Sequence, residues 1–403
     1  MTRWGARGAW TSALVLATVA SPAAQAASDD DVAVNAALIA ALPADGVTDL
    51  LVIAQPSAPD APRAWGATRV AASPAAIKDV LLDPAHYRAL IPALIKSELE
   101  RSNGSAPIVD WELEIPLFNL SGRMALHNRP DGVTIELFEG DFAPGRLSFT
   151  VAPDPRGGAT LVVGAVLDVK RSSWLLRRII KRSPVGEPAV LTAATYVALR
   201  AVALRAEHPR APDAWRPRAP AATPANWLPD PRPLASDLLA SLRARGVVAL
   251  VARTPDDHLA GVAAAVALNA PAAAVEATLR DPRSWLAFPG LAKVRIRPGP
   301  NGPGADVEDD LPLVDCDATW TSVSGPAPRW LATAGATRGA HLGWDVYPGA
   351  STIAALTLYP RIEATGSIAR RFIAAEPLLE EGLSLALAFV DAAGTRAALL
   401  TPH

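Results

Sequence analysis

The sequence predicts an α+β fold built from two tandem units, in which each unit wraps a curved antiparallel sheet around a long C-terminal helix. Three observations predict it: a collinear internal repeat, a proline-rich segment between the repeated parts, and the same series of short strands closed by one apolar helix in each part. The chain of 403 residues is long enough for two or three domains with sizeable cores.

The internal repeat covers most of the chain. The stretch LLDPAHY from Leu81 returns as LRDPRSW from Leu279, and LIAALPADGVTDLLV from Leu38 aligns with LLASLRARGVVALV from Leu238. Matching segments keep their order, and their offset changes only from 200 to 193 residues. Because this period is far too long for a solenoid, the repeat indicates a duplicated domain.

The repeat and the composition together predict the domain boundaries. Between the copies lies a segment with eight prolines from Pro209 to Pro233, which is typical of an extended, semi-rigid spacer. We therefore expect a leader over residues 1–26, copy one over 27–207, a proline-rich linker over 208–235 and copy two over 236–403.

The first 26 residues have the pattern of a secretory signal peptide. Arg3 and Arg7 precede the apolar run TSALVLATVA, and Ala24-Gln25-Ala26 forms a small-residue cleavage site. A membrane anchor is the alternative, but the apolar run is about half the length of a membrane span. We expect a mature chain that begins at Ala27 and is periplasmic or secreted. Cys316 is the only cysteine, so the chain has no intrachain disulfide and no thiolate metal cluster.

Each copy begins with the same order of elements. A short helix, over 34–42 or 237–244, leads through a glycine to two strands. Ser73-Pro74 then begins another helix, with serine as the N-cap and proline in the first turn. Asp83-Pro84 and Asp281-Pro282 repeat this capping device, with an aromatic residue, Tyr87 or Trp285, one turn later.

A series of alternating strands and a long helix complete each copy. In copy one the strands are IKSELERS, VDWELEIPL, GRMALHNRP, GVTIELFEG, GRLSFTVAP and ATLVVGAVLDV. The alternation places Trp111 on the opposite face from Glu112, and Met124 on the opposite face from His127. The final helix begins near Pro188 and carries an apolar stripe; in copy two, leucines recur at every fourth position from Leu379.

This order of elements, with the D-P-x-x-[YW] motif followed by a proline, resembles the START-like helix-grip superfamily, the polyketide cyclase and coenzyme-Q-binding branch also called SRPBCC. The resemblance covers roughly residues 38–206 and 238–393. It implies two tandem helix-grip domains, each with an apolar cavity between the sheet and the C-terminal helix that holds a lipid, sterol, isoprenoid or polyketide. Most members of the superfamily bind or carry such molecules, and a minority catalyse cyclisation or dehydration.

Strand alternation and the helix stripes give candidate residues that line such cavities: Trp111, Met124, Leu126, Phe149, Leu191, Ala194, Val197, Trp320, Trp344, Leu383 and Leu387. Three functions remain open. The protein is an exported binding or carrier protein for a hydrophobic small molecule, or an enzyme of the cyclase or dehydratase kind that uses carboxylates the sequence does not single out. In the third hypothesis, copy two is a structural partner that has lost its cavity.

Other chemical signatures are lacking in the sequence. It contains no GxSxG, P-loop, HExxH or dinucleotide-binding motif, so we expect no cofactor and no metal site. The histidines sort with the charged residues on the strands, and Asp256-Asp257-His258 is more typical of a turn than of a metal site. With 38 basic and 40 acidic residues, the chain has no excess of positive charge that would attract nucleic acid.

One basic cluster, KRSSWLLRRIIKR from Lys170 to Arg182, is the exception to this even charge distribution. Its arginines and lysines can touch anionic lipid headgroups while Trp174 enters the interface, which predicts a transient membrane-surface contact. The alternative is a solvated basic face on a short helix.

Overall fold

The computed structural model describes residues 29–54, 62–101, 106–115, 118–182, 185–209, 229–255, 257–288, 291–300, 302–309, 317–359, 370–371, 373–374 and 376–400. The predicted signal peptide, most of the proline-rich linker and Cys316 lie outside the described residues.

Copy one has the predicted order of elements. Its strands are β1 (Thr48–Ala54), β2 (Arg63–Val70), β3 (Leu94–Arg101), β4 (Ile108–Ile115), β5 (Phe118–Arg129), β6 (Gly132–Gly140), β7 (Phe142–Pro153) and β8 (Ala159–Asp168). Its helices are α1 (Asp29–Ala41), α2 (Pro74–Leu81), η1 (Pro84–His86), α3 (Tyr87–Leu90), η2 (Val169–Arg171), α4 (Trp174–Arg182) and α5 (Gly186–Glu207).

Copy two repeats that order. Its strands are β9 (Gly246–Arg253), β10 (Leu259–Leu268), β11 (Leu291–Gly299), β12 (Gly302–Asp309), β13 (Ala318–Ser322), β14 (Arg329–Gly335), β15 (His341–Tyr347) and β16 (Thr352–Tyr359). Its helices are η4 (Arg232–Ala235), η5 (Asp237–Leu239), α6 (Ala240–Arg243), α7 (Ala272–Arg280), η6 (Pro282–Ala287) and α9 (Leu379–Leu400). The helix expected over 237–244 is thus a 3₁₀ turn followed by one short α-helix.

These sixteen described strands form one antiparallel sheet, in the order β11-β12-β13-β14-β15-β16-β10-β9-β1-β2-β8-β7-β6-β5-β4-β3. The two copies join through β1 and β9, and Leu50 lies opposite Leu250. These two leucines are 200 residues apart, which is the offset of the repeat at this point. Since equivalent residues face each other, the copies are related by a local two-fold axis at this pair, as in a fused symmetric dimer.

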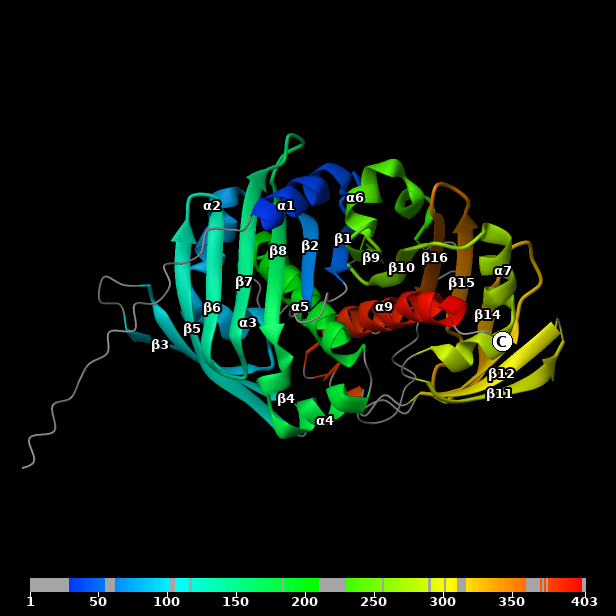
Figure 1. Cartoon of the computed structure of the whole chain (residues 1–403). Helices are drawn as coiled ribbons and strands as arrows, with labels where there is room; N and C mark the ends of the chain where they lie inside the picture. The colour runs from blue at the N-terminus through cyan, green and yellow to red at the C-terminus, as the bar shows by residue number, and fades with distance from the viewer. Residues whose placement is uncertain are drawn as a thin grey trace, which may run out of the picture.

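The long helices α5 and α9 lie along one face of the sheet and meet near the junction of the copies (Figure 1). Their crossing is close, because a Cβ added at Gly382 would come within 3.2 Å of the Ala193 carbonyl oxygen. Both helices are long and apolar enough to cross a membrane, but most of each one is buried inside the protein. Each sheet half therefore wraps a long helix, which confirms the predicted fold class.

Among the described residues, α1 and α6 cover the centre of the opposite face of the sheet. Val34, Leu38 and Leu42 of α1 pack there with Leu239 and Leu242 of copy two in one hydrophobic cluster. Strands β1, β9, β10 and β16 are consequently buried on both faces. This explains why the sequences of these strands are continuous apolar runs rather than alternations of apolar and polar residues.

The capping prediction is confirmed at two of its three sites. The Ser73 hydroxyl accepts a hydrogen bond from the Ala76 amide at 3.2 Å, and Asp281 accepts one from the Arg283 amide at 2.9 Å. The prediction for Asp83 is wrong: it makes no side-chain cap bond, and its carboxylate lies 2.6 Å from Nδ1 of His86 instead. The imidazole competes for the carboxylate that would otherwise cap the turn.

Candidate functional site

The predicted lining residues of copy one form a single apolar interior. Trp111, Met124, Leu126, Phe149 and Leu191 are all buried in one cluster between the sheet and α5. The alternation of the strands is the cause, since the polar residues next to them in sequence point to the other face.

Two predicted residues of α5 lie at the edges of that interior. Ala194 is half-buried against the same cluster. Val197 is buried in a different cluster, where it packs with Leu378 of copy two. Val197 therefore contributes to the junction of the copies rather than to the interior of copy one.

In copy two, Trp344 is fully buried, and Trp320 and Leu387 are half-buried against the same cluster. Leu383 is half-buried, while Leu385 and Phe389 of α9 occupy the core. Residues at every fourth position drift around a helix of 3.6 residues per turn, so the leucine series that starts at Leu379 cannot stay on the buried face.

An aromatic cluster lies in the interior of copy two. Trp285 of η6 lies edge-on to Trp330 of β14, with ring centroids 4.7 Å apart. Trp320 of β13 and Trp344 of β15 each lie 6.4 Å from Trp285, and Phe288 packs edge-to-face against Trp344 at 6.4 Å. Neighbouring strands and the capped turn of η6 thus bring together aromatic residues that are up to 59 positions apart in the sequence.

Three of these indole groups are unpaired hydrogen-bond donors. The Nε1–H groups of Trp285, Trp330 and Trp344 are buried and have no partner among the described residues. The interior of copy one has one such group, on Trp111. A buried polar group without a partner costs about 1–3 kcal/mol, so three of them in one cluster require an explanation.

A carboxyl group lies on the helix that covers this cluster. Asp391 of α9 has a pKa raised to about 7, and desolvation by burial is the cause. Asp391 as a residue is half-buried. An acid with a strongly perturbed pKa on the helix that covers an interior marks a candidate functional site.

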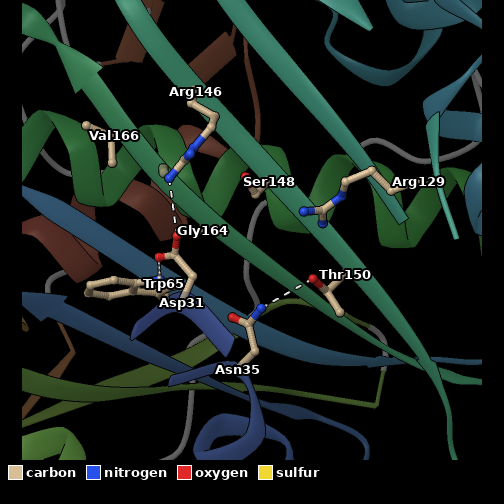
Figure 2. Close-up of a pocket in the computed structure, with 10 residues that line it drawn as sticks. Asp31, Asn35, Trp65, Arg129, Arg146, Ser148, Thr150, Gly164 and Val166 are labelled. Atoms are coloured by element: carbon tan, nitrogen blue, oxygen red, sulfur yellow. Dashed lines mark hydrogen bonds and ion pairs between the residues drawn. The ribbon is translucent and has the colours of Figure 1, made fainter. Parts of the chain in front are cut away.

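A second polar site lies where α1 crosses the outer face of the sheet (Figure 2). Asp31 accepts hydrogen bonds from Trp65 at 3.1 Å and from Arg146 at 3.2 Å, and Asn35 donates to Thr150 at 3.2 Å. The enclosed space is about 10 Å³, which is room for one water molecule. These contacts dock α1 onto the sheet and leave no room for a larger ligand.

A third polar site, a buried charge network, joins the two copies. Asp49 of β1 accepts hydrogen bonds from Tyr196 of α5 at 3.0 Å and from Arg253 of β9 at 3.1 Å. Asp257 of copy two accepts from Arg200 of α5 at 2.8 Å and also pairs with Arg253. Burial pushes the pKa of Asp49 upward, but Arg253 and Arg200 outweigh it and hold the pKa below its usual value.

The turn predicted for Asp256-Asp257-His258 is confirmed for its described residues. The Asp257 amide donates to the Thr254 carbonyl at 2.9 Å, and Asp257 adopts a left-handed backbone with φ of 64°. This turn places the Asp257 carboxylate between two arginines of different copies, a role that the sequence did not reveal. In the part of the chain that the structure describes, no three His, Cys, Asp or Glu residues gather as a metal site would require.

Sequence reasoning missed Trp330 and Asp391, and it gave Trp285 only a structural role. A signal for each was present. Asp391 is the one acid in the apolar run LALAFVDAAG, and four of the 11 tryptophans fall between Trp285 and Trp344. The sequence does not show which strands pair, and it is this pairing that brings the four tryptophans into one cluster.

The fold and this site define a class: a tandem helix-grip protein whose second copy has an aromatic, partly polar interior. No family model and no curated protein matches the chain. Solved structures similar to it include a START superfamily protein from Mycobacterium smegmatis, which is 20% identical over 36% of this chain and 97% of its own, with a TM-score of 0.30.

Two further similar structures are the di-domain ARO/CYC StfQ from the steffimycin biosynthetic pathway and a STAR-related lipid transfer protein from Xanthomonas axonopodis. The first is 11% identical and covers 81% of this chain and 98% of its own, with a TM-score of 0.27. The second is 17% identical and covers 41% and 95%, with a TM-score of 0.28. The helix-grip assignment rests on the strand order of the sheet and on the long helix that each half of it wraps.

Proposed function

We propose that this protein binds a hydrophobic small molecule between the sheet and the long helix, and holds or carries it. The observation that supports this most is the set of three buried indole donors around Trp285 that lack partners. A protein interior that serves packing alone pairs such groups or replaces them with apolar atoms. An interior lined by aromatic residues with a few unpaired polar groups is typical of a small-molecule site.

The test compares two leucine-to-aspartate variants in the full chain. Leu387→Asp places a carboxylate beside the copy-two interior, whereas Leu286→Asp places one on an exposed position of η6. We expect Leu387→Asp to weaken binding of a fluorescent quinone or fatty acid analogue by several kcal/mol, because a buried unpaired carboxylate is costly. Leu286→Asp should bind as the wild type does.

The corresponding variant in copy one is Ala194→Asp on α5, and it shows whether that copy also holds the probe. Circular dichroism checks that each variant remains folded, and Leu387→Asn replaces Leu387→Asp if the charge unfolds the chain. Equal binding by Leu387→Asp and the wild type would remove copy two as the site. If Ala194→Asp alone loses the probe, copy two is the structural partner.

An enzyme of the cyclase or dehydratase kind is the second candidate. It is favoured by Asp391, because a carboxyl group with a pKa of about 7 can exchange protons at neutral pH. A wild-type protein that binds no apolar probe and turns over a polyketone would establish the enzyme in place of the carrier.

We further propose that α4 contacts an anionic membrane surface. Trp174, Arg177 and Arg178 are exposed and share one helix face, while Leu176 and Ile180 are buried on the other. Lys170 and Arg171 pair with acids, at 3.0 Å to Glu187 and 3.2 Å to Asp168, so the free charge of the segment is smaller than the sequence suggests. An outward face with one tryptophan and two arginines suits the interface of an anionic bilayer.

Arg177→Gln/Arg178→Gln should therefore bind phosphatidylglycerol vesicles roughly 30-fold more weakly than the wild type, at about 1 kcal/mol for each arginine. Co-sedimentation measures this, with Arg283→Gln, an exposed arginine of η6, as the control. If neither wild type nor variant sediments with the vesicles, the basic face is simply solvated.

Export is proposed on the signal-like pattern of residues 1–26 alone. The mature chain would then begin at Ala27 and be found in the periplasm or the medium. N-terminal sequencing of the protein from cell fractions tests this, and an intact N-terminus in the membrane fraction counts against it.

A further inference from the structure

Asp391 lies on the part of α9 that packs against the interior of copy two. Ala388 and Thr395, which lie three residues before it and four after it, are fully buried, and residues at this spacing share a helix face. Gly394, one turn along, packs so closely on Phe288 that an added Cβ would come within 2.7 Å of the ring. Phe288 in turn contacts Trp344. Asp391 is therefore one helical turn from a residue that packs on the aromatic cluster.

No counter-ion balances this carboxyl group in the described part of the chain. The elements packed against α9 are α5, α7, β9, β10, β16 and η6. Burial alone shifts its pKa, so none of their charged groups acts on it. The charged or titratable residues of those elements and of the adjoining turn of α9 are Glu187, Tyr196, Arg200, Arg205, Glu207, Arg253, Glu276, Arg280, Arg283, Tyr359 and Arg396.

Three unpaired polar groups of this interior can only donate, the indole N–H groups of Trp285, Trp330 and Trp344. The hydroxyl of Ser284 in η6 is also unpaired and can donate, and a protonated Asp391 adds a carboxyl O–H. Each buried donor without an acceptor costs about 1–3 kcal/mol of free energy, and a ligand that brings an acceptor removes this cost.

We propose that Asp391 is the polar anchor of the copy-two interior, and that the ligand which fits it is a neutral apolar molecule carrying carbonyl-type acceptors. This inference rests on the proposed function, since it names the ligand chemistry of the same site. An ionised Asp391 turns from donor to acceptor and repels a carbonyl oxygen, so binding weakens once the carboxyl group loses its proton.

The competing occupant is a cation. Aromatic faces and a carboxylate together can bind a quaternary ammonium group. Such a ligand leaves the three indole donors unpaired, because it brings no acceptor, and it would bind more tightly as Asp391 ionises. The two chemistries therefore predict opposite pH dependence.

The experiment uses menadione, methylnaphthalene and a naphthyl trimethylammonium ion, three probes with the same ring skeleton, and calorimetry on the full chain. We expect menadione to bind more tightly than methylnaphthalene, and its affinity to fall about tenfold from pH 6 to pH 8, as one proton is lost from the anchor. Asp391→Asn keeps a donor without a titration, so it should keep the affinity at pH 6 and abolish the fall. Trp330→Phe should weaken menadione about fivefold or more and leave methylnaphthalene unchanged.

The possible failures are distinct. If the wild type binds no probe at any pH, the proposed function itself fails. Equal affinity for menadione and methylnaphthalene, with no effect of Asp391→Asn, overturns the anchor and leaves the apolar binding site intact. Ammonium binding that tightens with rising pH and is lost in Asp391→Asn overturns the acceptor chemistry in favour of a cation.

Discussion

Asp49→Ala is expected to lower the free energy of unfolding by about 3–5 kcal/mol, the usual cost of removing one partner from a buried ion pair. Asp49 is fully buried and receives hydrogen bonds from Tyr196 and Arg253. Its removal leaves Arg253 with one carboxylate, Asp257, to share with Arg200. Urea denaturation of the full chain, followed by circular dichroism, measures the effect.

The matched control is Arg232→Ala, which breaks the exposed pair between Arg232 and Asp230. Exposed pairs contribute about 0–1 kcal/mol, so this variant should unfold close to the wild type. Because the network joins β1, β9 and α5, the Asp49 variant should also uncouple the copies. Two separate unfolding transitions would show this directly. A loss no larger than that of Arg232→Ala would mean that the network contributes nothing to the junction.

Glu381→Gln is expected to stabilise the protein by about 3 kcal/mol at pH 8 and to leave its stability near pH 4.5 almost unchanged. Burial raises the pKa of Glu381 to about 7, and the attraction of Arg200 offsets this only in part. In the unfolded chain the group titrates near its ordinary value of 4.5. Between these two values the native state binds the extra proton, so stability falls as the pH rises from about 4.5 through 7.

Glutamine keeps the shape of the side chain and carries no charge to desolvate, so it removes this part of the pH dependence. Glu376 and Asp391 also have a raised pKa of about 7, and the remaining slope in Glu381→Gln comes from them. Glu114→Gln, at an exposed strand position, is the control and should follow the wild-type profile. A variant whose stability at pH 8 equals that of the wild type would show that Glu381 is already ionised in the folded protein.

The interiors of the two copies differ in their polar groups. The interior of copy one is apolar apart from one unpaired indole group, while that of copy two adds two more such groups and a carboxyl group. The two copies therefore have interiors of different chemistry on one sheet. Trp285 of η6, Trp330 of β14, Trp344 of β15 and Asp391 of α9 are the residues that make the difference.

The sequence by itself determined the fold class and the duplication. The collinear repeat required two similar units, and the alternation of apolar and polar residues placed Trp111, Met124 and Trp344 on the inner faces. These are local properties, since a strand's period decides which side chains share a face without reference to its partner. The period of a helix placed Leu191 and Ala194 of α5 on the copy-one interior in the same way, whereas Val197 packs at the junction of the copies.

Only the tertiary structure decided how the copies join. The runs VTDLLVIA and VVALVA are apolar on both faces, which indicates central strands. They do not indicate which strand lies beside each of them, because the backbone groups along the edge of a strand can pair with any other strand. The pairing of β1 with β9 therefore could not be read from either run. The same holds for Asp257 and Asp391, whose neighbours come from distant segments, and burial and charge around a carboxyl group exist only after those segments have packed.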